Sequence, residues 1–95
     1  MLERFGGRFE SWEPLGQGAE GKLYRVRDTW TGRLCALKVA SDPAGAAALT
    51  HEFTLLSRYR HPALIESLDL VRESGDTAHL MEYVPAVDPR TVIGR

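Results

Sequence analysis

The amino-acid sequence predicts an α+β fold with five strands and one principal helix. Short runs of β-forming residues alternate with turn residues along most of the chain. Only one stretch, residues 43–59, has apolar residues at steps of three and four, the spacing of one helical face. The elements therefore follow the order β-β-β-α-β-β. The 95 residues are enough for one domain or part of one, because domains usually contain about 100 to 150 residues.

The first three strands follow one another through two turns. They are expected over residues 8–15, 22–27 and 33–40. The glycine-rich segment Gly16–Gly21 lies between the first two, and β-forming residues follow it, so it joins strand to strand. Asp28 and Gly32 bound the second turn. The third strand is almost entirely apolar in its middle, and Lys38 is its charged exception.

The helix is expected over residues 43–59. Asp42 supplies an N-cap side chain, and Pro43 suits the first helical position because its missing N–H costs nothing there. The apolar face of the helix consists of Ala46, Leu49, Phe53 and Leu56. His61-Pro62 is expected to end the helix. Two further strands are expected over 64–71 and 77–84, with a turn at residues 74–76.

Composition and charge argue against several classes of partner. The chain has 12 Lys and Arg residues against 13 Asp and Glu residues, a balance that provides no field for nucleic acid or an anionic membrane. Cys35 is the only cysteine, so an internal disulfide is excluded and a reducing setting is expected. Neither a signal peptide nor a bilayer-spanning apolar segment is recognised. We therefore expect a cytoplasmic protein that binds neither nucleic acid nor membrane.

The glycine-rich segment Gly16–Gly21 and Lys38 are the candidates for a phosphate site. Glycines let backbone N–H groups approach phosphate oxygens, and a lysine adds a compact positive charge. A dinucleotide-binding unit would need a helix directly after the glycines, and a P-loop would need Ser or Thr where Leu23 stands. A plain hairpin turn is the alternative that stays open for so short a motif.

Lys38 should either reach solvent or find an anion, because an unpaired ammonium in an apolar strand is costly. Glu52 is the candidate anion, since it lies close to the apolar face of the expected helix. A pair between the two would keep the ammonium charged and aimed at phosphates. Ala36, on the same face of the strand, leaves room for a flat ligand such as a purine. The alternative is a surface lysine and a solvated glutamate.

The single cysteine and the three histidines are expected to have structural or surface roles. Cys35 lies between apolar neighbours and is expected to be a small buried hydrophobe rather than a reactive thiol. His51, His61 and His79 lack the spacing of metal ligands, so a structural or surface role is expected for each and no metal site is predicted.

Five motifs occur in order along the chain. They are the glycine-rich Leu15–Tyr24, the turn Asp28-x-x-Thr31-Gly32, the strand Cys35-Ala36-Leu37-Lys38, Glu52 nine residues before His61-Pro62, and the segment Leu80-Met81-Glu82-Tyr83-Val84. Together they resemble the N-terminal lobe of the protein kinase family, in the style of bacterial serine/threonine kinases. The resemblance covers about residues 9–88. It implies a five-stranded antiparallel sheet with one principal helix, preceded by an extension at 1–8 and followed by the start of a second lobe at 89–95.

The resemblance also implies that the lobe binds ATP. Lys38 would contact the α- and β-phosphates while paired with Glu52, and these two are the catalytic residues that the resemblance assigns. The other implied nucleotide contacts are Gly16, Gly18 and Gly21 over the phosphates, Leu15, Leu23 and Ala36 around the adenine, Met81 as gatekeeper, the backbone of Glu82 and Val84 at the adenine edge, and Asp88 near the ribose.

Three departures from the family pattern bear on function. Glu20 puts a negative charge at the loop tip, the interval between Lys38 and Glu52 is short by several residues, and neither a catalytic-loop H-R-D nor a metal-binding D-F-G follows Asp88. We therefore expect the ATP-binding lobe of a serine/threonine protein kinase that is inactive alone. Mg²⁺ and a protein substrate would be bound only with a second lobe. The alternative is a pseudokinase-type or standalone lobe that binds a protein partner through exposed apolar surface.

Overall fold

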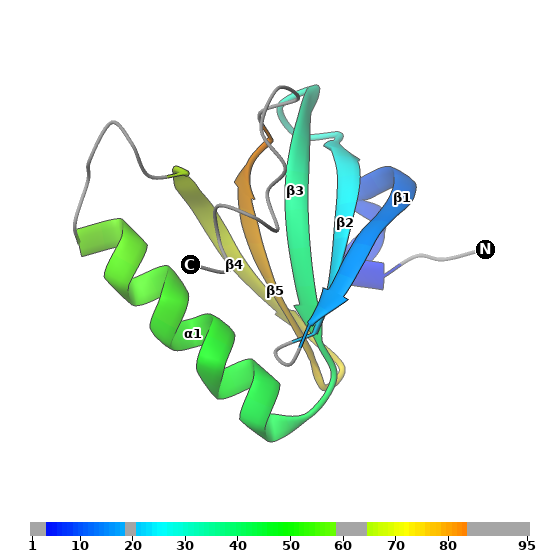
Figure 1. The fold of residues 1–95 in the computed structure, drawn as a ribbon. Helices are drawn as coiled ribbons and strands as arrows, with labels where there is room; N and C mark the ends of the chain where they lie inside the picture. The colour runs from blue at the N-terminus through cyan, green and yellow to red at the C-terminus, as the bar shows by residue number, and fades with distance from the viewer. Residues whose placement is uncertain (1–3, 19–20, 59–64, 84–95) are drawn as a thin grey trace.

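The computed structural model describes residues 4–18, 21–58 and 65–83, and within them one sheet carries one long helix (Figure 1). The elements are the 3-10 turn η1 (Arg4–Gly7), the strands β1 (Phe9–Gly18), β2 (Gly21–Asp28), β3 (Arg33–Ala40), β4 (Ser67–Glu73) and β5 (Asp76–Glu82), and the helix α1 (Pro43–Arg58). Neighbouring strands are all antiparallel, in the order β1-β2-β3-β5-β4. The predicted α+β class and element order are confirmed, and η1 is an addition.

The first strand is longer than its sequence pattern predicts. β1 continues to Gly18 instead of ending at residue 15, because Gly16 pairs with Leu23 and Gly18 pairs with Gly21 on β2. The glycine-rich segment is therefore largely part of the β1–β2 ladder rather than a loop outside it.

The fourth strand begins later than predicted. Ile65 and Glu66 lie within the predicted range 64–71, but β4 starts at Ser67. The amide of Glu66 donates to the side-chain Oε1 atom of Glu82 at 2.9 Å, and the Glu66 carbonyl accepts from the Glu82 amide at 3.0 Å, so one side-chain and one backbone hydrogen bond join Glu66 to β5. The other elements begin and end within two residues of their predicted bounds.

Strand alternation divides the sheet into two faces. Leu37 and Val39 of β3 point to what we call the outer face, whereas Ala36 and Lys38 point to the helix face, where α1 packs against β3, β4 and β5. Figure 1 shows α1, in green, running across this side of the sheet. The buried core of the outer face consists of Phe5, Phe9, Val26, Cys35, Leu37, Val39, Ala78 and Leu80. Burial there raises the pKa of the Cys35 thiol, as expected for a buried hydrophobe.

The helix α1 begins where its cap predicts. The Gly45 amide donates to Asp42 Oδ1 at 2.6 Å, so the Asp42 side chain satisfies one of the unpaired N–H groups at the helix start. On the predicted apolar face, Leu49 is fully buried and Phe53 packs its ring edge-on against His79. Among the described ranges, no helix is long and apolar enough to cross a membrane.

Arg8 joins the N-terminal segment to the sheet through ion pairs and hydrogen bonds. Its Nε and Nη2 atoms donate to the two carboxylate oxygens of Asp28 at 3.0 and 2.9 Å, and its Nη1 atom donates to Asp69 at 2.8 Å. The hydrogen bond from Arg8 is the main reason that the pKa of Asp28 lies below its usual value, in spite of burial. The same guanidinium lies 4.0 Å from the ring centroid of Trp30. This network links Arg8, which lies between η1 and β1, to the end of β2, the β2–β3 turn and β4.

Candidate functional site

Lys38 and Glu52 meet on the helix face. Alternation along β3 directs Lys38 toward α1, where it is only 8% exposed, and α1 brings Glu52 opposite it. The Lys38 Nζ atom lies 3.1 Å from Oε2 and 3.4 Å from Oε1 of Glu52. The short interval between the two residues in the sequence does not prevent their contact. The pair fixes the Lys38 ammonium beside a carboxylate, on a strand whose middle is otherwise apolar.

Glu52 is held in its charged form from two sides. Burial by itself would raise the pKa of this carboxyl. The hydrogen bond from His79 and the positive charge of Lys38 outweigh burial, so the pKa of Glu52 lies below its usual value. The carboxylate therefore stays ionised at neutral pH and keeps a counter-charge beside Lys38.

His79 is a part of the site that sequence reasoning missed. It is fully buried on β5 directly opposite Lys38 in the β3–β5 register, and its Nδ1 atom lies 2.7 Å from Glu52 Oε1. Its Nε2 atom lies 2.7 Å from Ser67 Oγ on β4. The sequence predicts a structural or surface role for His79 and does not give its partners, which depend on strand register. The available signal is its position two residues before Met81, which places both residues on the helix face.

An apolar cluster lies next to Lys38 on the same face. It gathers the buried side chains of Leu23, Ala36, Ile65 and Met81, with Leu15 and Tyr83 packed against them. Leu23 pairs directly with Lys38 between β2 and β3, so the cluster adjoins the charged pair. Four residues named from the sequence are thus brought together: Leu15, Leu23 and Ala36 as adenine contacts, and Met81 as gatekeeper. Sequence reasoning did not assign the two others, Ile65 and Tyr83, to the site, although both lie within predicted strands.

Gly18 and Gly21 differ in what their surroundings demand. At Gly18, an added Cβ atom would meet nothing within 4 Å. At Gly21, it would lie 2.0 Å from the carbonyl oxygen of Val39, and the backbone φ of 151° is one that L side chains rarely adopt. Glycine is therefore required at position 21 by the close approach of β2 to the end of β3, whatever it contributes to ligand binding.

Several residues named from the sequence lie outside the described part of the chain. These are Glu20, His61-Pro62, Val84 and Asp88. Glu82 is described: its amide donates to the Glu66 carbonyl at 3.0 Å, at the start of β4.

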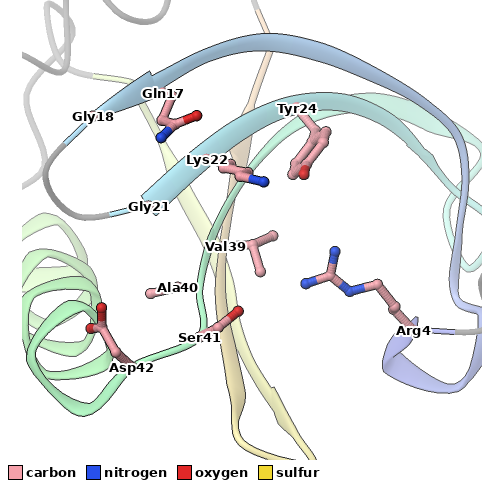
Figure 2. Close-up of a pocket in the computed structure, with 10 residues that line it drawn as sticks. All are labelled: Arg4, Gln17, Gly18, Gly21, Lys22, Tyr24, Val39, Ala40, Ser41 and Asp42. Carbon is pink, nitrogen blue, oxygen red and sulfur yellow. The ribbon is translucent and has the colours of Figure 1, made fainter.

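A separate cavity of about 300 Å³ lies beside the glycine-rich hairpin (Figure 2). Its walls include Tyr24 and Val39, which belong to the outer-face side of the sheet, and Arg4 of η1. Lys38 and Ala36 do not line it. The cavity is thus distinct from the charged pair and the apolar cluster on the helix face.

Several known proteins are similar in sequence to this chain over most of its length. No protein-family model matches the chain. A probable serine/threonine-protein kinase of Arabidopsis thaliana is 33% identical over 87% of the chain and 12% of that protein. A probable serine/threonine-protein kinase of Streptomyces coelicolor is 32% identical over 85% of the chain and 13% of that protein. The DNA damage-responsive serine/threonine-protein kinase RqkA of Deinococcus radiodurans is 36% identical over 70% of the chain and 10% of that protein.

The fold and these relatives define one class of protein. A five-stranded antiparallel sheet with one helix is the architecture of a protein kinase N-terminal lobe, and the relatives, bacterial and eukaryotic, are serine/threonine protein kinases. The chain is a protein kinase-related N-terminal lobe. It spans about an eighth of the length of these relatives or less.

Acidification is expected to destabilise the fold through Glu52 and Asp28. The pKa of each is lowered in the folded chain from ordinary values of 4.5 and 3.8. The unfolded chain therefore binds more protons between the folded and unfolded pKa values, and the stabilisation present above pH 4.5 is lost as pH falls through the folded values. Urea unfolding from about pH 6 down to about pH 3 checks this, with Glu52→Gln as the variant that should show a shallower decline. A free energy of unfolding that stays constant over this range would contradict it.

Proposed function

We propose that this lobe binds ATP on its helix face, between the glycine-rich hairpin and the Lys38–Glu52 pair. The observation that carries the proposal is a buried ammonium, held 3.1 Å from a carboxylate and adjoining an apolar cluster. A charged group fixed beside apolar side chains suits a ligand that combines phosphates with a flat aromatic base. The serine/threonine kinase relatives support the same ligand.

The residues of the proposed site suit the two ends of the nucleotide, the phosphates and the adenine. Lys38, kept charged by Glu52, would neutralise the α- and β-phosphates beneath Gly16, Gly18 and Gly21. Leu15, Leu23 and Ala36 would enclose the adenine, with Met81 behind it. Ala36 and Met81 have no exposed surface, so side chains packed over them must move when the base enters. Backbone groups of Glu82 and Val84 and the side chain of Asp88 complete the proposed contacts.

The same residues suit a role in phosphoryl transfer. ATP, with Mg²⁺ held by a second lobe, supplies the phosphoryl group that a serine/threonine kinase passes to a protein hydroxyl. The contribution of this chain is to hold the phosphates in place through Lys38, whose position is fixed by Glu52. We propose that the acceptor base and the protein substrate belong to that second lobe, and that this lobe alone binds nucleotide without transferring phosphate.

Replacing Lys38 is expected to weaken nucleotide binding. Lys38→Met keeps much of the side-chain volume but removes the charge, and a hydrogen bond to a charged group contributes about 1.5 to 3 kcal/mol, or roughly 10- to 100-fold in affinity. Lys22→Ala is the matched control, because Lys22 is an exposed lysine that lines the separate cavity beside the glycine-rich hairpin. Titration with a fluorescent ATP analogue measures both, and circular dichroism checks that each variant is folded. Equal affinities for Lys38→Met and the unmodified chain would refute the proposed phosphate contact.

A further inference from the structure

The buried imidazole of His79 has no part in the nucleotide contacts proposed above. It lies between two elements, with Glu52 of α1 on one side and Ser67 of β4 on the other. The ring of Phe53, also from α1, packs edge-on at a centroid distance of 5.8 Å. A fully buried polar ring is costly unless both of its nitrogens are hydrogen-bonded. Here both nitrogens have partners at 2.7 Å.

The partners determine where the proton of His79 lies. An ionised carboxylate can only accept, so Nδ1 must carry a proton and donate to Glu52 Oε1. In the neutral ring, Nε2 then accepts a hydrogen bond from the Ser67 hydroxyl. A hydroxyl can also accept, so the arrangement stays satisfied if Nε2 gains a proton. Ser67 therefore keeps the ring oriented with Nδ1 toward Glu52 in either protonation state.

The two carboxylate oxygens of Glu52 have different nearest partners. Oε1 lies 2.7 Å from His79 and 3.4 Å from Lys38, whereas Oε2 lies 3.1 Å from Lys38. The nearest contact of Oε1 is thus to the imidazole, and Oε2 is the oxygen nearer to the ammonium. Without the imidazole, the carboxylate could rotate about its last side-chain bond, whose torsion is broad.

We propose that His79 is a positioning residue, which with Ser67 orients the Glu52 carboxylate so that one of its oxygens faces Lys38. The orientation acts through Glu52 and Lys38, and its effect on ligand affinity rests on the proposed ATP site. The hydrogen-bond chain Ser67–His79–Glu52–Lys38 crosses β4, β5, α1 and β3, so it also couples the helix to the sheet on both sides of the carboxylate.

The tautomer of His79 tests the orientation without any nucleotide. ¹⁵N NMR of the imidazole in the unmodified, nucleotide-free chain should show Nδ1 protonated, whereas free neutral imidazole side chains favour a proton on Nε2. A His79 ring protonated only at Nε2 would overturn the proposal, because it could not donate to Glu52.

Two substitutions separate the hydrogen bond from packing. His79→Leu fills the space but removes the donor, whereas His79→Asn retains an N–H close to the position of Nδ1. We expect the Glu52 carboxyl, followed by ¹³C NMR, to titrate at higher pH in His79→Leu and near its original pH in His79→Asn. Affinity for a fluorescent ATP analogue should fall about fivefold in His79→Leu and recover to within about twofold in His79→Asn.

The outcomes distinguish this proposal from the ATP site itself. If Lys38→Met lowers affinity and His79→Leu does not, the positioning role is overturned and the ATP site stands. An equal loss in His79→Leu and His79→Asn shows that the ring only packs, which also overturns it. If Lys38→Met leaves binding unchanged, the ATP site fails, and the His79 tautomer and the Glu52 titration alone decide the positioning role.

Discussion

Gly21→Ala is expected to lose about 3 kcal/mol or more of unfolding free energy, which leaves a domain of this size largely unfolded. The new Cβ atom would lie 2.0 Å from the carbonyl oxygen and 2.8 Å from the carbonyl carbon of Val39. Both are backbone atoms of β3, so they can move only if the pairing of Lys22 with Val39 opens. The φ of 151° adds backbone strain for any residue with a side chain.

Gly18→Ala is the matched control for this effect. Gly18 pairs with Gly21 at the end of the same hairpin, but an added Cβ atom meets nothing within 4 Å there. The control should therefore change the unfolding free energy by about 0.5 kcal/mol or less. Urea unfolding followed by circular dichroism measures both variants. Equal and small losses at the two glycines would show that β2 and β3 do not approach as closely as the structure indicates.

Asp28→Asn is expected to destabilise the chain by about 3 to 5 kcal/mol, because it leaves the buried Arg8 guanidinium without its main counter-charge. Asp28 accepts two hydrogen bonds from Arg8 and a third from the Trp30 amide at 3.0 Å. An amide can replace only part of this set, and it brings no negative charge. The loss should release η1 and Phe9 from the outer face, since Arg8 lies between them in the chain.

Asp69→Asn provides the control, because Asp69 contacts the same guanidinium but its side chain is 43% exposed. A pair open to water contributes about 1 kcal/mol or less, so this variant should remain close to the original stability. A double variant, Arg8→Met with Asp28→Asn, should recover part of the loss, since it removes the uncompensated charge. Thermal or urea unfolding of the four chains tests this, and similar losses for Asp28→Asn and Asp69→Asn would contradict the assignment of Asp28 as the main partner.

The sequence predicts elements best where turn and cap chemistry bounds them. β3 is predicted with its observed bounds, because the turn that ends at Gly32 precedes it and the Asp42 cap follows it. The end of β1 is not predicted, since glycines usually signal a turn, whereas here Gly16 and Gly18 pair with β2. Tertiary pairing overrides the local preference in this segment.

The candidate site is only partly predicted from the sequence, because some of its contacts also depend on tertiary pairing. Lys38 and Glu52 are found through family motifs and through the cost of a buried charge. His79 is not recognised as part of the site from the sequence, because its contact with Glu52 depends on the register of β3 against β5 and on the place where α1 crosses β5. Neither quantity is contained in the periodicity of a single segment. The structural role of Gly21 likewise depends on the approach of Val39, a residue 18 positions further along the chain.

Methyl NMR during an ATP titration tests the central proposal most directly, because the two faces of the sheet carry different methyl groups. Leu23, Ala36 and Met81 report on the helix face, and Val39 and Ala78 report on the outer face. We predict that ATP shifts the helix-face methyl signals, leaves the outer-face signals almost unchanged, and has no such effect in Lys38→Met. Shifts that concentrate at Val39 and Ala78, or helix-face shifts that persist in Lys38→Met, would contradict binding at the Lys38–Glu52 pair.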